Sequence, residues 1–155
     1  MVTSPTRGKH IVLAEDNLAD VALVRMALEN SALIYELRVL DDGEKAIAFI
    51  EQSDANPKAC RIDLLLLDMH LPKCDGEEIL KCLRSSDRYA ETPVVVMTAS
   101  DAPHDLAQAK KHAAMHYFRK PSNFAEFMRL GSIVRDLLSP DYSSAELPEV
   151  RGAER

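Results

Sequence analysis

The 155-residue sequence predicts a doubly wound α/β fold, a five-stranded parallel sheet covered by helices on both faces. Short apolar runs alternate with longer helical patterns along the chain. Two of these runs, residues 62–67 and 93–97, are almost continuously apolar, as expected for strands buried on both faces. Turn-forming residues separate the runs from the helical segments. Right-handed crossovers between parallel strands then leave only a few doubly wound topologies.

The boundaries of the elements have their own signals in chain order. An Asp-Asp-Gly turn at 41–43 ends the second strand, and Asp-Gly at 75–76 precedes the third helix. Asn123, three residues before Glu126, resembles a helix cap, and Ser-Pro at 139–140 ends the last helix. The expected strands are 10–14, 36–40, 62–67, 93–97 and 116–118, and the expected helices are 19–30, 44–52, 77–85, 103–113 and 123–138.

Composition excludes several classes of function. Nineteen basic against 25 acidic side chains give a net charge of −6, which disfavours binding to nucleic acid through its phosphates. Four Tyr, four Phe and no Trp argue against a base-stacking surface. The apolar run at 46–50 is too short to span a membrane, and the amino terminus lacks the apolar core of a signal peptide. We therefore expect a cytoplasmic protein with no membrane or nucleic-acid partner.

The cysteines point to no redox or zinc chemistry. Cys60, Cys74 and Cys82 are odd in number and form no CxxC pair, so reduced thiols are expected. The length favours one domain. We expect a tail over residues 1–8, a folded domain over 9–138 and a polar tail over 139–155, with no room for an output domain.

Polar residues gather where the expected strands end. Parallel strands bring their carboxyl ends to one edge of the sheet, where ligands of open α/β sheets bind. Glu15, Asp16 and Asn17 follow the first strand, Asp68 the third, Thr98 the fourth, and Lys120-Pro121 the fifth.

This set suits phosphoryl transfer. Three carboxylates repel one another unless a cation lies between them, and Mg²⁺ prefers such oxygen ligands. Asp68, after the most apolar strand, is the expected nucleophile, with Thr98 and Lys120 contacting the phosphoryl oxygens. Taken singly, Glu15 and Asp16 also suit the first turn of a helix, and Lys120 suits a solvated surface.

The combined motif resembles the receiver domain of bacterial two-component response regulators. The matching pieces are Glu-Asp-Asn at 15–17, Asp-Met-His-Leu-Pro at 68–72 with Asp-Gly at 75–76, Thr-Ala-Ser at 98–100, and Lys-Pro at 120–121. Thr98 follows Asp68 by 30 residues and Lys120 follows it by 52, as in chemotaxis-type receivers. The resemblance covers residues 9–138 and implies a flavodoxin-like sheet in the order 2-1-3-4-5.

The resemblance also implies the roles of the site residues. Asp68 would accept a phosphoryl group from a histidine kinase, and Lys120 would contact that group. The peptide bond between Lys120 and Pro121 would be cis. Thr98 would move towards the phosphoryl group and let Tyr117 turn inward as a switch. Mg²⁺ would be held by Glu15, Asp16, Asp68 and the backbone carbonyl of His70.

Within the family, residues 15–20 and the longer second-helix region are similar to single-domain regulators that act with phytochrome kinases. The alternative function is an interaction module with the receiver fold that is never phosphorylated. His70 matches a variable position that tunes the loss of the phosphoryl group.

Three other site chemistries fit the residues less well. His112 and His116 have i,i+4 spacing, but His116 begins a strand, so the two do not share a helix face. A nucleotide-binding flavodoxin-like protein needs a glycine- or hydroxyl-rich phosphate loop where this chain has Glu15 and Asp16. The segment 68–72 lacks the second aspartate of DxDx[TV] phosphatases.

The last expected helix carries two apolar stripes. One stripe, with Phe124, Phe127, Met128, Val134 and Leu138, is expected to face the core. The second, with Leu130, Ile133 and Leu137, is expected to be surplus and to form a homodimer surface, which Tyr142, Leu147 and Val150 of the tail would extend.

Overall fold

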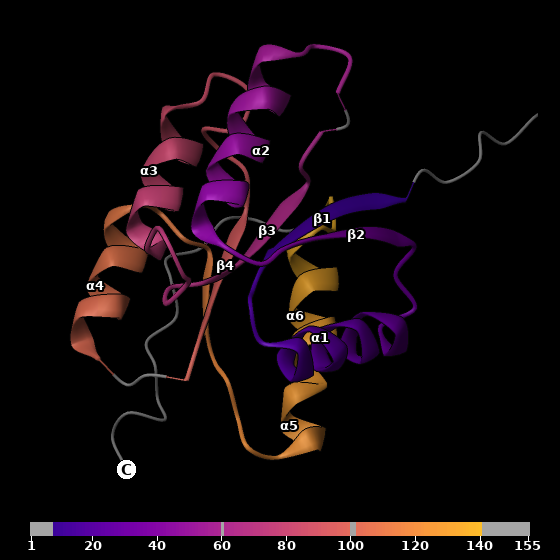
Figure 1. The fold of residues 1–155 in the computed structure, drawn as a ribbon. Helices are drawn as coiled ribbons and strands as arrows, with labels where there is room; N and C mark the ends of the chain where they lie inside the picture. The colour runs from indigo at the N-terminus through magenta and orange to yellow at the C-terminus, as the bar shows by residue number, and fades with distance from the viewer. Residues whose placement is uncertain (1–7, 60, 100–101, 141–155) are drawn as a thin grey trace, which may run out of the picture.

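A computed structural model describes residues 8–59, 61–99 and 102–140. Five parallel strands form one sheet in the order β2-β1-β3-β4-β5 (Figure 1). The predicted fold and strand order are confirmed. The strands are β1 (Lys9–Ala14), β2 (Tyr35–Leu40), β3 (Leu64–Asp68), β4 (Val94–Thr98) and β5 (His116–Arg119).

Four helices begin at an Asn or Asp side chain that accepts the backbone N–H of the residue three positions along. These caps fix where α1, α2, α3 and α5 begin, directly after the strand ends or loops that carry polar residues. The helix α4 has Pro103 at its first position instead. The helices are α1 (Leu18–Asn30), α2 (Gly43–Ala55), α3 (Gly76–Ser85), α4 (Pro103–Lys111), α5 (Phe124–Phe127) and α6 (Arg129–Leu137).

The sheet separates two apolar layers. Helices α2, α3 and α4 cover one face, and α1, α5 and α6 cover the other (Figure 1). Every residue of β3 and β4 is buried, because these central strands are covered on both faces. Successive residues of β3 point to opposite faces of the sheet. Leu65 and Leu67 pack in the layer with α2, α3 and α4, and Leu64 and Leu66 pack in the layer with α1, α5 and α6.

The last helix differs from its prediction. It is divided at Met128 into α5 and α6, and Phe124, which we expected in the core, is 52% exposed. Leu130 and Leu137 are buried in the layer with α1, so the expectation that they form a surplus dimer stripe is wrong. Both are buried because α6 packs so closely on α1 that a Cβ at Gly131 would collide with the Ala27 carbonyl.

Arg84, near the end of α3, anchors the carboxyl end of α4. Its guanidinium donates to the carbonyls of His112 (2.8 Å) and Ala113 (3.2 Å), which follow α4. It also donates to the carbonyls of Ala90 (3.0 Å) and Thr92 (2.8 Å), before β4. One side chain thus ties α3, the approach to β4 and the end of α4 together.

Candidate functional site

The neighbouring strands β1 and β3 bring the acidic residues together. Ala14 of β1 pairs with Leu67 of β3, so Glu15 and Asp68 follow side by side at the carboxyl edge of the sheet. This is the point where the strand order reverses, the usual ligand site of such sheets. Glu15, Asp16 and Asp68 each offer a carboxylate oxygen, and these oxygens lie within 4.8 Å of one another. The three predicted acidic residues therefore form one cluster.

Lys120 places its ammonium among these carboxylates. Its Nζ donates to Glu15 Oε2 (2.6 Å), Asp20 Oδ2 (2.8 Å) and Asp68 Oδ2 (3.1 Å). The Lys120 side chain is only 10% exposed, so these charge-assisted bonds are largely shielded from water. The backbone holds the lysine there, because Lys120 N donates to the Thr98 carbonyl at 2.8 Å.

The Lys120–Pro121 peptide bond is trans, so the prediction of a cis bond is wrong. The expectation assumed that a trans bond would carry the ammonium away from the site. In the structure the long lysine side chain reaches Asp68 from a trans backbone.

Burial and neighbouring charges raise the pKa values of both Glu15 and Lys120, for different reasons. Burial of Glu15 raises its pKa to about 7, against the lowering effect of its bonds to Lys120 and to the Asn17 N–H. Burial also works against charge on Lys120, but hydrogen bonds to Asp20 and Glu15 and the charge of Asp68 outweigh it and raise the pKa of Lys120. Lys120 therefore stays a cation throughout the physiological range.

The loop after Asp68 is held by backbone contacts. The His70 N–H donates to Asp68 Oδ1 at 2.9 Å, so the two carboxylate oxygens of Asp68 have different partners. Gly43 N donates to the Pro72 carbonyl at 2.9 Å, and a Cβ at Gly43 would collide with Cys74. The carbonyl of His70 as a metal ligand stays a prediction.

The His70 side chain makes a contact that the sequence did not suggest. Its Nε2 lies 2.7 Å from Asp105 Oδ2 in the first turn of α4. Asp105 is 2% exposed, so the carboxylate side of this contact is buried. This bond joins the loop behind Asp68 to the amino end of α4.

Thr98 and Tyr117 lie on the same side of the sheet. Thr98 is fully buried at the end of β4 and Tyr117 is half-buried on β5. Tyr117 pairs with Val96, two residues before Thr98, and packs against the layer of α2, α3 and α4. Both side chains therefore face that layer.

The comparisons with known proteins agree with this geometry. Residues 11–130 match the family model described as the response regulator receiver domain. The chain belongs to this family.

Two relatives illustrate the similarity. The response regulator Rcp1 of Synechocystis sp. is 34% identical over 122 residues, covering 79% of this chain and 83% of Rcp1. The structure of the phosphorylated cyanobacterial phytochrome response regulator RcpA is 31% identical, with a TM-score of 0.78, and covers 88% of this chain and 98% of that one. The Mn²⁺-bound form of Rcp1, also 31% identical, has a TM-score of 0.75 and covers 88% and 99%.

Two acidic residues in this receiver escaped the sequence analysis. Asp20 and Asp105 lie in the first turns of α1 and α4, where an acidic residue is ordinarily explained by the helix itself. Their contacts with Lys120 and His70 span 100 and 35 residues, and no local pattern reports such a distance. For Asp20 the one available signal is its position four residues after Asp16.

The histidines and cysteines considered in the sequence analysis lie outside the site. His112 ends α4 and His116 begins β5, and among the described residues the metal-ligand cluster consists of Glu15, Asp16 and Asp68 alone. Cys74 and Cys82 are free thiols, as expected, while Cys60 lies outside the described residues. No helix in the described ranges has the length and apolarity to cross a bilayer.

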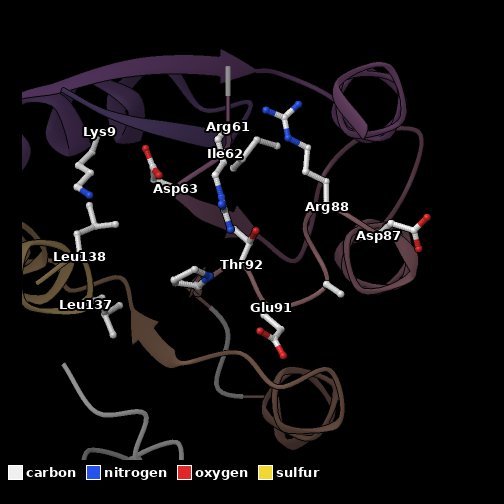
Figure 2. A pocket seen from close by; sticks show the side chains of 12 residues that line it. Lys9, Arg61, Ile62, Asp63, Asp87, Arg88, Glu91, Thr92, Leu137 and Leu138 are labelled. Carbon is white, nitrogen blue, oxygen red and sulfur yellow. The ribbon is translucent and has the colours of Figure 1, made fainter. Parts of the chain in front are cut away.

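A separate hollow of about 680 Å³ lies at the amino edge of the sheet (Figure 2). Asp63 and Arg88 line it, with charges of both signs. Asp63 accepts the His10 N–H at 2.8 Å, and Arg88 donates to carbonyls at and beyond the end of α2. Asp63 and Arg88 thus already have partners within the fold, and the hollow lies at the opposite edge of the sheet from the acidic cluster.

Replacing Glu15 by Gln is expected to stabilise the metal-free protein at pH 8. The pKa of Glu15 is about 7 in the fold against an ordinary 4.5, so the folded state binds more protons between these values. Stability therefore declines as the pH rises from about 4.5 to about 7, and E15Q lacks this decline. The gain at pH 8 is on the order of 1–3 kcal/mol, measured by urea unfolding.

The control is Glu44→Gln, which removes an exposed carboxylate from the first turn of α2. Added Mg²⁺ should stabilise the wild type at pH 8 more than E15Q, because it binds the folded cluster. An equal pH slope for E15Q and the wild type would contradict the prediction.

Proposed function

We propose that this receiver is a single-domain response regulator that takes a phosphoryl group from a sensor histidine kinase onto Asp68. Its output is then a change in a protein-interaction surface. The observation that carries the proposal is the arrangement at Asp68, whose Oδ2 faces the Lys120 ammonium at 3.1 Å beside two further carboxylates. A nucleophilic carboxylate, a fixed cation and a metal-ligand cluster are the groups that phosphoryl transfer needs.

The transfer balances with the residues present. An Asp68 carboxylate oxygen attacks the phosphorus of phosphohistidine, and the P–O bond forms as the P–N bond breaks. The electron pair of the P–N bond returns to the ring nitrogen, and because the other ring nitrogen of the phosphohistidine carries a proton, the leaving group is neutral imidazole. Lys120 stabilises the charge on the transferred oxygens. Thr98, at the neighbouring strand end, is proposed to hydrogen-bond another of them.

The acidic cluster fits Mg²⁺, because its donors are all oxygens and they converge within 4.8 Å. Glu15, Asp16, Asp68 and the His70 carbonyl would hold the ion. When bound, it supplies positive charge against the phosphoryl oxygens. The Mn²⁺-bound form of Rcp1 is a related receiver described with a divalent cation.

Asp68→Asn should abolish phosphorylation by acetyl phosphate in the presence of Mg²⁺, because the amide is not a nucleophile. Phosphate-affinity gel electrophoresis measures the slowed band of the phosphorylated chain. The matched control is Asp87→Asn, an exposed carboxylate at the opposite edge of the sheet, which should be phosphorylated like the wild type.

A wild-type chain that shows no slowed band would favour the alternative function, an interaction module that is not phosphorylated. The three carboxylates around Lys120 argue against that alternative, since a cluster of carboxylates costs free energy that a fold used only for binding does not need to spend.

The proposed switch joins Thr98 to Tyr117. When Thr98 shifts towards a phosphoryl group, space opens on the face that both residues share, and the half-buried Tyr117 ring turns inward. Tyr117 ring signals in NMR spectra should shift on phosphorylation, while those of the fully buried Tyr89 should not.

A kinase partner must contact the surface beside Asp68. Leu18 begins α1 and Phe124 begins α5, both just beyond strand ends at the site edge, and they are 83% and 52% exposed. Large apolar side chains exposed beside a site are suited to contact a protein partner. We propose that the kinase docks here, and that it is a phytochrome kinase, as the name of the relative RcpA suggests.

Leu18→Asp should slow phosphotransfer from the kinase about fivefold or more, because it places a charge in the contact. Phosphorylation by acetyl phosphate should be unchanged, since a small donor needs no docking. The control Ile34→Asp changes a 60% exposed residue before β2, at the other edge, and should leave both rates intact. Equal slowing with both donors would instead indicate damage to the site.

We also propose a homodimer through the last helix, with fewer surface residues than the sequence suggested. Of the three residues expected to form its surface, only Ile133 is partly exposed, and the tail residues lie outside the described chain. Sedimentation equilibrium, with Ile133→Glu as the variant expected to be monomeric, tests the proposed homodimer.

The free thiols of Cys74 and Cys82 favour the cytoplasm as the place of action.

A further inference from the structure

Lys120 has a partner that phosphoryl transfer does not require. An ammonium group has three N–H donors, and each is directed at a different carboxylate: Glu15, Asp20 and Asp68. A phosphoryl oxygen can therefore reach the Lys120 ammonium only by displacing one of the three. Which carboxylate is displaced bears on how tightly the site holds a phosphoryl group.

Asp20 differs from the other two carboxylates in its surroundings. Glu15 and Asp68 belong to the metal-ligand cluster, whereas Asp20 does not. Its described side-chain contact is the 2.8 Å bond to Lys120 Nζ, which joins the first turn of α1 to the segment after β5. Among the described contacts, Asp20 therefore touches the site only through Lys120.

The fold also fixes Asp20 in place. The Asn17 side chain accepts the Asp20 N–H at 3.1 Å, which sets the first turn of α1. The Asp20 side chain is 21% exposed and that of Lys120 is 10% exposed. Attraction between two charges that are mostly withdrawn from water is stronger than at an open surface.

From these contacts we propose that Asp20 is a positioning residue that competes with the phosphoryl group for Lys120. It holds the ammonium on the α1 side of the site, and an arriving phosphoryl oxygen must draw Lys120 away from it. The proposal rests on the function proposed above and specifies how this chain sets its affinity for the phosphoryl group.

The charges give the sign of the effect. With all groups ionised, Glu15, Asp16, Asp20 and Asp68 carry four negative charges, against three positive charges from Lys120 and one Mg²⁺ ion. The charge of Asp20 therefore attracts Mg²⁺ and repels an anion. Removing it should weaken the binding of the cation and strengthen the binding of the anion.

Asp20→Asn should bind the phosphoryl mimic BeF₃⁻ about three- to tenfold more tightly at saturating Mg²⁺, and bind Mg²⁺ alone about three- to tenfold more weakly. The chain has no Trp, so isothermal titration calorimetry is the appropriate measurement. Asp20→Ala should shift both affinities in the same directions, because the lost charge and not the new amide causes the effect. Asp20→Glu, which keeps the charge, should stay near the wild type.

The matched control is Glu29→Gln, which removes an exposed carboxylate at the far end of the same helix and should change neither affinity. A purely structural role for Asp20 would weaken both ligands together. That result, or unchanged affinities in D20N and D20A, would overturn the proposal. A wild-type chain that fails to bind BeF₃⁻ would instead overturn the proposed function.

Discussion

The ammonium of Lys120 is the charge on which the candidate site depends. Carboxylates from the end of β1, the first turn of α1 and the end of β3 converge on it at 2.6–3.1 Å. Without a cation between them, these acids would repel one another in surroundings that exclude most water. Burial already raises the pKa of Glu15 to about 7 with the lysine in place. The folded chain therefore keeps its acidic cluster because β5 delivers one buried cation to it.

The sheet explains why these groups meet although they lie far apart in the sequence. Parallel strands put every carboxyl end at one edge, and the reversal of strand order between β1 and β3 opens a space there. Asx caps then start α1, α2 and α3 at fixed points beyond the edge. Backbone bonds, such as Lys120 N to the Thr98 carbonyl, position the segments that carry the functional side chains.

Much of this could be predicted from the sequence because it follows from periodicity and strand ends. The apolar run before Asp68 identified a central strand, and the polar residues at strand ends identified Glu15, Asp16, Thr98 and Lys120. The sequence could not predict contacts between residues that lie far apart in the chain and belong to no recognised motif. The bond from His70 to Asp105 depends on how α4 packs against the loop after β3.

The last helix shows the opposite error, since a pattern was present but was misread. Two apolar stripes suggested one buried and one exposed face. In the structure α6 approaches α1 closely at Gly131, and this closeness buries Leu130 and Leu137. A helical wheel gives the angle of each residue but not how closely a helix approaches its neighbours, and here Gly131 leaves room for a close approach.

The anchoring of α4 has a mechanical consequence. Its carboxyl end is fixed by two bonds from Arg84, to the His112 and Ala113 carbonyls, and by Glu77, which pairs with Lys111. Its amino end has no side-chain cap and is tied to the loop after Asp68 by the contact of His70 with Asp105. A nine-residue helix is about 13 Å long. The two ends of α4 are thus held by different parts of the chain, and a displacement of the loop behind Asp68 would reach the helix at its amino end, one helix length from the end that Arg84 holds.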